Sequence, residues 1–161
     1  MRKLIVAALA AAASLAALPH AGAQSPAAAP AAAAPAAAAA LPRTPSPPGA
    51  EVYIISPRNG AKVRSPVRVL FGLKGMGIAP AGIKFDNTGH HHLLIDSDPP
   101  ANLAAPLPAT DKLLHFGKGQ TETSLTLAPG RHTLQLLFAD QNHIPHDPPL
   151  ISKKITITVE P

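Results

Sequence analysis

The sequence contains no cysteine, which excludes disulfides, a lipid-modified N-terminal cysteine and thiolate metal ligands. It has no tryptophan and a single tyrosine, so the exposed aromatic platforms that usually bind sugars are lacking. A Gly-x-Ser-x-Gly elbow, a phosphate-binding glycine loop and a calcium-binding run of acids are also missing. These absences disfavour serine hydrolases and nucleotide-, calcium- and sugar-binding proteins.

Long apolar runs are scarce, and the one from Leu4 to Leu18 is shorter than the roughly 20 residues that a membrane-spanning helix needs. Arg2 and Lys3 precede it, and a small-x-small cleavage pattern ends at Ala23. This arrangement predicts a signal peptide over residues 1–23. We therefore expect a periplasmic or secreted protein with no transmembrane segment in its mature form.

Charge of either sign is also sparse, and the formal net charge of +5 falls to about +3 without Arg2 and Lys3. The basic residues are scattered rather than clustered, which favours a solvated surface over a polyanion-binding patch. Nucleic acid is therefore not an expected partner. Residues 24–50 are rich in Ala and Pro, a composition that forms no packed core and predicts a disordered linker.

From residue 51 onward, short β-branched and aromatic runs alternate with turns rich in Gly, Pro and Asn. With no sustained helical period, this pattern predicts an all-β domain over residues 51–161, an Ig-like antiparallel β-sandwich of six or seven strands. The expected strands cover residues 52–55, 63–71, 91–96, 113–116, 123–127, 132–139 and 151–159. The expected long loops cover residues 72–82, 102–110 and 140–149.

Alternation along the longest expected strand predicts which side chains form the core. Leu134, Leu136 and Phe138 share one face by the two-residue period of a strand, and Leu125 and Leu127 should pair with them across the preceding Pro-Gly turn. Leu137 points to the opposite face, where we expect either an energetic cost or a contact site.

Seven of the eight histidines lie in this domain, and three are consecutive, from His90 to His92. Alternation along a strand places His90 and His92 on one face, about 6.5–7 Å apart, with His91 on the more apolar face. Two imidazoles at this spacing can chelate one metal ion. His115 and His143 are the next candidate ligands, and His132 and Asp140 are less favoured ones. Such a ligand set suits Zn(II) or Cu(II) rather than Cu(I).

Four motifs cover residues 87–96, which include the three histidines, and residues 114–122, 127–136 and 140–143. Together they resemble an exported bacterial family known as domain of unknown function 4399. The resemblance spans roughly residues 76–159. It implies an exported one-domain protein with a histidine-rich site, and it implies no activity.

Three functions stay open at this point. The first is a non-enzymatic exported protein that binds a transition metal such as Cu(II) or Zn(II). The second is a cell-envelope interaction module, in which the histidines are structural ties and the loops at 72–82 and 102–110 contact a partner. The third, and least favoured, is an enzyme that uses a histidine-bound metal on a small substrate. For the metal site, the expectation is that binding fades below about pH 6, because ligating imidazoles must be neutral.

Overall fold

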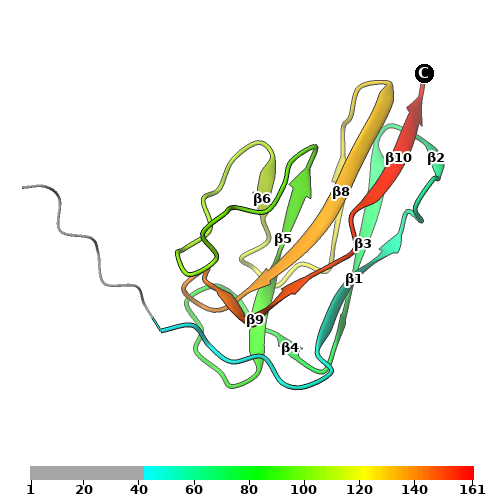
Figure 1. Cartoon of the computed structure of the whole chain (residues 1–161). Helices are drawn as coiled ribbons and strands as arrows, with labels where there is room; N and C mark the ends of the chain where they lie inside the picture. The colour runs from blue at the N-terminus through cyan, green and yellow to red at the C-terminus, as the bar shows by residue number, and fades with distance from the viewer. Residues whose placement is uncertain (1–41) are drawn as a thin grey trace, which may run out of the picture. The chain divides into compact units, whose positions relative to one another are not determined.

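The computed structural model describes residues 42–161, so the expected signal peptide and most of the expected linker lie outside the described residues. Residues 42–161 form an all-β sandwich with no helix, in agreement with the predicted fold class (Figure 1). No helix in this part of the chain is long and apolar enough to cross a membrane. The strands are β1 (Glu51–Ser56), β2 (Lys62–Arg64), β3 (Val67–Lys74), β4 (Gly77–Ile78), β5 (Thr88–Ile95), β6 (Leu113–His115), β7 (Glu122–Leu125), β8 (Gly130–Ala139), β9 (Pro145–Ile151) and β10 (Ile155–Glu160).

The strands form two sheets. The smaller sheet has the order β1-β3-β7, and the larger has the order β2-β10-β8-β5-β4, with β6 added to β5 and β9 added to β8. At the centre of the larger sheet, β5 runs antiparallel to β8, from His90 opposite Ala139 to Ile95 opposite Leu134. This register determines which side chains of β5 and β8 meet on each face.

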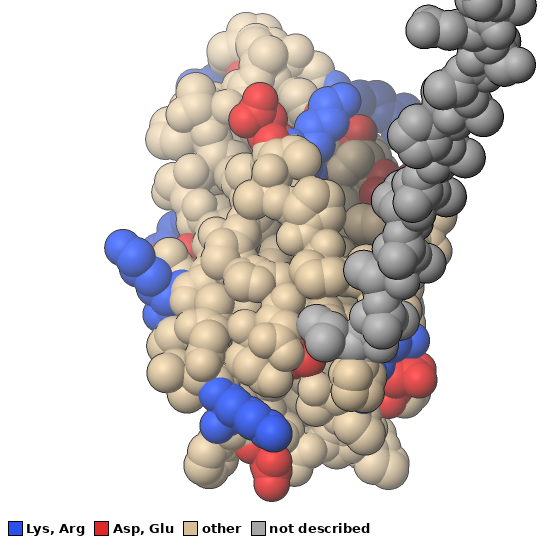
Figure 2. Space-filling view, turned by 90° about the vertical axis from the view of Figure 1, so that its left-hand side faces the viewer, with Lys and Arg blue, Asp and Glu red and all other residues tan. Residues whose placement is uncertain are grey.

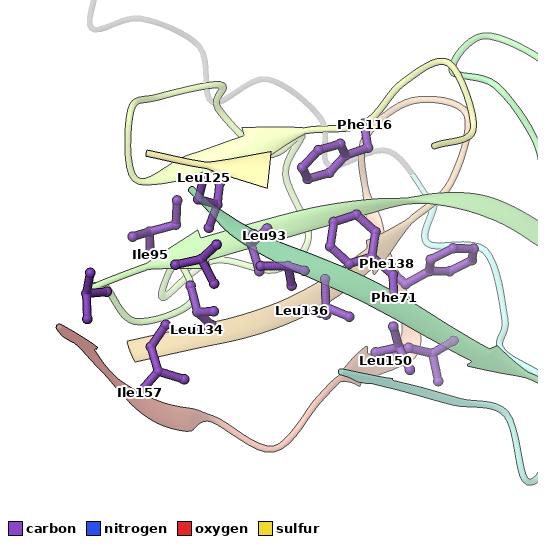
Figure 3. Packing of buried hydrophobic residues seen from close by; sticks show 14 residues of the cluster. Phe71, Leu93, Ile95, Phe116, Leu125, Leu134, Leu136, Phe138, Leu150 and Ile157 are labelled. Carbon is purple, nitrogen blue, oxygen red and sulfur yellow. The ribbon is translucent and has the colours of Figure 1, made fainter. Parts of the chain in front are cut away.

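The main core lies between the sheets. Leu134, Leu136 and Phe138 point into it and have essentially no exposed surface, as predicted. Figure 3 shows side chains of both sheets meeting there, with Leu93 beside Leu136 and Phe71 near Phe138. Burying each such side chain contributes roughly 1.5–3 kcal/mol, so this layer is the main source of the fold's stability.

A second, smaller core covers the outer face of the larger sheet. Leu137 is completely buried there with Leu94, Leu107, Leu113 and Ala139. Leu107 belongs to the long loop between β5 and β6, and this loop therefore covers apolar surface of its own domain. The apolar side chain of Leu137 therefore carries no energetic cost, because β8 is buried on both faces.

Two strands occupy segments that were predicted to be loops. The short strand β4 pairs parallel to β5, and β9 pairs with the end of β8. The prediction missed β9 because Pro148 and Pro149 interrupt its pattern and its middle is exposed. Prolines are tolerated on such an edge strand, where no partner needs their missing N–H groups. The expected strand at 63–71 also divides into β2 and β3, so the described residues hold ten strands instead of the predicted six or seven, and two of the pairings are parallel.

The folded unit begins before the expected boundary at residue 51. Residues 43–46, which we call the strap, run along the outer side of β9, with Pro45 bridged to Asp147 in a parallel arrangement. The backbone N–H of Ser46 donates to the carbonyl of Asp147, and the N–H of Asp147 donates to the carbonyl of Thr44. The end of the Ala/Pro-rich region is therefore part of the domain.

Charged side chains are dispersed over the surface. On the face in Figure 2, small groups of both signs are separated by uncharged surface. Arg68 pairs with Glu122 at 2.6 Å, and Lys154 pairs with Asp98. This distribution agrees with the solvated surface expected from the sequence.

Candidate metal centre

The predicted alternation along β5 is confirmed. His90 and His92 project away from the main core, whereas His91, Leu93 and Ile95 point toward it. His90 and His92 are nevertheless 0% and 1% exposed, and their four ring nitrogens have no hydrogen-bond partner. An unsatisfied buried polar group costs about 1–3 kcal/mol. His91 and His146 also lack partners for their ring nitrogens, so what distinguishes His90 and His92 is that their rings lie side by side, with centroids 4.8 Å apart.

A third imidazole comes from β6, where His115 lies directly opposite His92 in the antiparallel pair. The two rings stack with centroids 5.1 Å apart. One ring nitrogen from each of His90, His92 and His115 can be chosen so that all three lie within 4.8 Å of one another. The register of β5 with β6 thus brings together two segments more than twenty residues apart.

His143 completes the group from the loop that follows β8. Its Nε2 atom lies 3.1 Å from Nε2 of His115, and the six ring pairs among the four histidines have centroids 4.6 to 6.1 Å apart. A tetrahedral ion with Zn–N bonds of 2.0–2.1 Å needs ligand nitrogens about 3.3 Å apart. His90, His92 and His115 form the trio that could hold an ion, and His143 lies next to His115 at close to this nitrogen–nitrogen spacing.

The surroundings keep three of these imidazoles neutral. Burial, followed by repulsion from neighbouring histidines, lowers the pKa of His90 to about 4 and that of His92 to about 2. The pKa of His115 is also lowered, first by desolvation and then by His143. Neutral imidazole is the form that coordinates a metal, and the lowered pKa values keep His90, His92 and His115 in that form near pH 7.

Asp140, one of the two less favoured candidate ligands, lies beside the cluster, and both of its carboxylate oxygens accept hydrogen bonds. Oδ1 accepts hydrogen bonds from the backbone N–H groups of Asn142 and Ile144, and Oδ2 accepts one from the hydroxyl of Thr44. Its negative charge acts to raise the pKa of His90, whereas burial and the neighbouring histidines lower it. This geometry supports a role in holding the loop around His143 rather than a role as ligand.

His132, the other less favoured candidate, lies at the opposite end of β8 from the cluster. Its Nδ1 atom is 2.7 Å from the carboxylate of Asp96, and its Nε2 atom is 2.9 Å from the carbonyl of Ala128. Two oxygen acceptors favour the doubly protonated ring, and the bond to Asp96 raises the pKa of His132. His132 therefore ties the end of β5 to the start of β8.

Two further histidines are buried outside the cluster. His91 packs between Phe71 and Phe138 in the main core, with ring centroids 5.1 and 5.2 Å away. His146, on β9, stacks on Phe138 at 5.8 Å. The sequence predicted His91 on the more apolar face of its strand, as observed, and predicted no role for His146, because its burial depends on β9, where the sequence predicts a loop.

The fold and these side chains define an all-β sandwich with a group of four histidines, two of them fully buried, on the outer face of its larger sheet. The family model described as a domain of unknown function, DUF4399, matches residues 69–160. The chain belongs to this family. Neither the curated proteins nor the solved structures gave a match to the chain.

Proposed function

We propose that this domain is an exported, non-enzymatic protein that binds one divalent transition-metal ion. The observation that carries the proposal is the convergence of His90, His92, His115 and His143, whose two buried members have ring nitrogens without any partner. Binding an ion would satisfy those nitrogens and remove the cost of leaving them unpaired. Export to the periplasm or beyond is supported by the signal-like pattern of residues 1–23.

The donor set favours Cu(II) or Zn(II). All four candidate ligands are imidazoles, which suit both ions. Soft donors are lacking: the chain has no cysteine, and Met76 packs against the main core, on the other face of β5 from His90 and His92. Cu(I), which prefers sulfur ligands, is therefore disfavoured.

A second candidate function, an envelope interaction module, is favoured by one surface feature. Ile83 and Phe85 are 55% and 72% exposed on the loop between β4 and β5. The backbone of this loop is bonded to Gly117 and Gln141, close in sequence to His115 and His143. Exposed apolar side chains of this kind are common at protein interfaces. If no metal binds, the exposed side chains of Ile83 and Phe85 are where we would look for a partner's binding site.

The direct test is a calorimetric titration of the metal-stripped, untagged protein with Cu(II) and Zn(II) at pH 7.5. We expect one equivalent to bind with sub-micromolar affinity, on the order of 8 kcal/mol or more of binding free energy. His90→Ala combined with His92→Ala should abolish this binding, because it removes both buried ligands. His132→Ala is the matched control, since it removes a histidine of the same domain outside the cluster. A stoichiometric ion retained by the double variant would refute the ligand assignment.

Gly117 offers a milder perturbation of the same site. A Cβ atom at this position would lie 2.2 Å from Cε1 and 2.4 Å from Nε2 of His115, so the imidazole must turn away from the cluster. Because His115 is exposed, Gly117→Ala should leave folding nearly unchanged and weaken metal affinity by about tenfold. Isothermal calorimetry in two backgrounds checks the cause. In a His115→Ala protein, Gly117→Ala should have no additional effect, and an equal loss there would show that it acts by another route.

A further inference from the structure

The strap at residues 43–46 is held on β9 by more than backbone pairing. The Nε–H of Arg43 donates to the carbonyl of Pro145 at 3.0 Å, and its guanidinium also donates to the carbonyl of His146 and pairs with Asp147 at 3.1 Å. Together with the two backbone bonds to Asp147, these contacts dock the strap beside the loop that carries His143.

Asp140 connects the strap to that loop. It is 1% exposed, and its two carboxylate oxygens serve different partners. Oδ2 accepts the hydroxyl proton of Thr44 at 2.8 Å, while Oδ1 accepts the N–H groups of Asn142 and Ile144 at 2.8 and 3.0 Å. The hydrogen bond from Thr44 therefore orients the same carboxylate that holds the backbone on both sides of His143.

His143 depends on this support because its backbone is in the left-handed region, with φ of 65°. Such a conformation is unfavourable for a non-glycine residue and persists only where the surroundings enforce it. Here the N–H of His143 donates to the carbonyl of Asp140 at 2.9 Å, and the N–H of Leu107 donates to the carbonyl of His143 at 2.9 Å. The position of the imidazole beside His115 thus follows from a loop that Asp140 organises.

We propose that the strap is a positioning element of the metal site, with Thr44 acting on His143 through Asp140. The inference rests on the proposed metal binding. Because the coupling is an equilibrium property, it works in both directions. Docking of the strap strengthens metal binding, and a bound ion strengthens docking of the strap. The strap is therefore docked more firmly on β9 when the site holds an ion.

The experiment compares Thr44→Val, Thr44→Ser and wild type by Zn(II) calorimetry and by electron paramagnetic resonance of the Cu(II) form. Thr44→Val removes the hydroxyl while keeping the branched shape, and it should weaken Zn(II) binding by about tenfold and alter the Cu(II) signal. Thr44→Ser should restore both. Ser65→Ala is the control, because that hydroxyl accepts the N–H of Leu127 and touches neither the strap nor Asp140. It should bind like wild type. If Thr44→Val fails to fold, Arg43→Gln loosens the strap without touching Asp140 and should also weaken binding.

Hydrogen exchange adds a second test, because Zn(II) would not change the exchange rates of the strap amides if the strap were purely structural. The amides of Ser46 and Asp147, which pair the strap with β9, should exchange more slowly after Zn(II) is added. Unchanged affinity in Thr44→Val, with Zn(II) binding intact in wild type, would overturn the strap inference alone. Absence of Zn(II) and Cu(II) binding by wild type would instead overturn the proposed function, and this inference with it.

Discussion

The metal-free domain is expected to lose about 6 kcal/mol of unfolding free energy when the pH falls from 7.5 to 5. Three fully buried histidines cause this loss: His90, His91 and His92 have pKa values of about 4, 4 and 2 in the folded state, against an ordinary value of 6.5. Below pH 6.5 the unfolded chain binds protons that the folded state cannot accept. Their contribution is thus complete above the unfolded pKa and is lost as the pH falls toward the folded one, by about 2 kcal/mol each at pH 5.

Other groups modify this result without reversing it. Burial also lowers the pKa of His146, which adds to the loss. His132 has a raised pKa, so its contribution has the opposite sign, being complete below pH 6.5 and lost as the pH rises. Hydrogen bonds and His132 lower the pKa of Asp96, so its contribution is lost only in stronger acid. Since domains of this size have total stabilities of about 5–15 kcal/mol, the metal-free protein should be close to unfolding at pH 5.

Urea denaturation at a series of pH values measures this effect directly. The slope of stability against pH should correspond to an uptake of about three protons on unfolding between pH 5 and 6. His91→Leu is the informative variant, because His91 faces the main core and is outside the metal cluster. It should reduce the total loss by about a third. A stability that stays constant from pH 7.5 to 5 would contradict the neutral burial of these rings.

Gly89→Ala is expected to destabilise the domain by about 3 kcal/mol and to disrupt the histidine cluster at the same time. A Cβ atom on Gly89 would lie 2.2 Å from the carbonyl oxygen of Ala139 and 2.8 Å from the ring of Phe138. The first contact is with backbone, which cannot rotate away, so β5 must shift relative to β8. His90 follows Gly89 directly and would move with it.

Thermal and urea unfolding of Gly89→Ala, compared with Gly77→Ala, separates this clash from the general effect of replacing a strand glycine. The Cβ atom of Gly77→Ala would approach only a methyl group of Thr88, at 3.2 Å, which a small side-chain movement relieves. We therefore expect Gly77→Ala to change stability by less than about 1 kcal/mol. Equal stability of the two variants would argue against the close approach of β5 and β8 at Gly89.

The sequence by itself determined the properties that depend on local periodicity. Alternation along β8 identified Leu134, Leu136 and Phe138 as core residues, and alternation along β5 separated His90 and His92 from His91. The absence of cysteine excluded thiolate ligands from any metal site. These conclusions follow from the two-residue period of a strand or from composition. None of them requires knowledge of which strands are neighbours.

Only the tertiary structure decided which histidines meet. His115 joins the cluster through the register of β6 with β5, and His143 joins it because β8 pairs with β5 so that Ala139 lies opposite His90. The same pairing carries His132 to the far end, where Asp96 holds it. Pairing of distant segments also created β9 and the docked strap, both of which read locally as loop or linker because of their prolines. Contacts of this kind depend on long-range strand register, which is determined by the packing of the whole sandwich rather than by any local pattern.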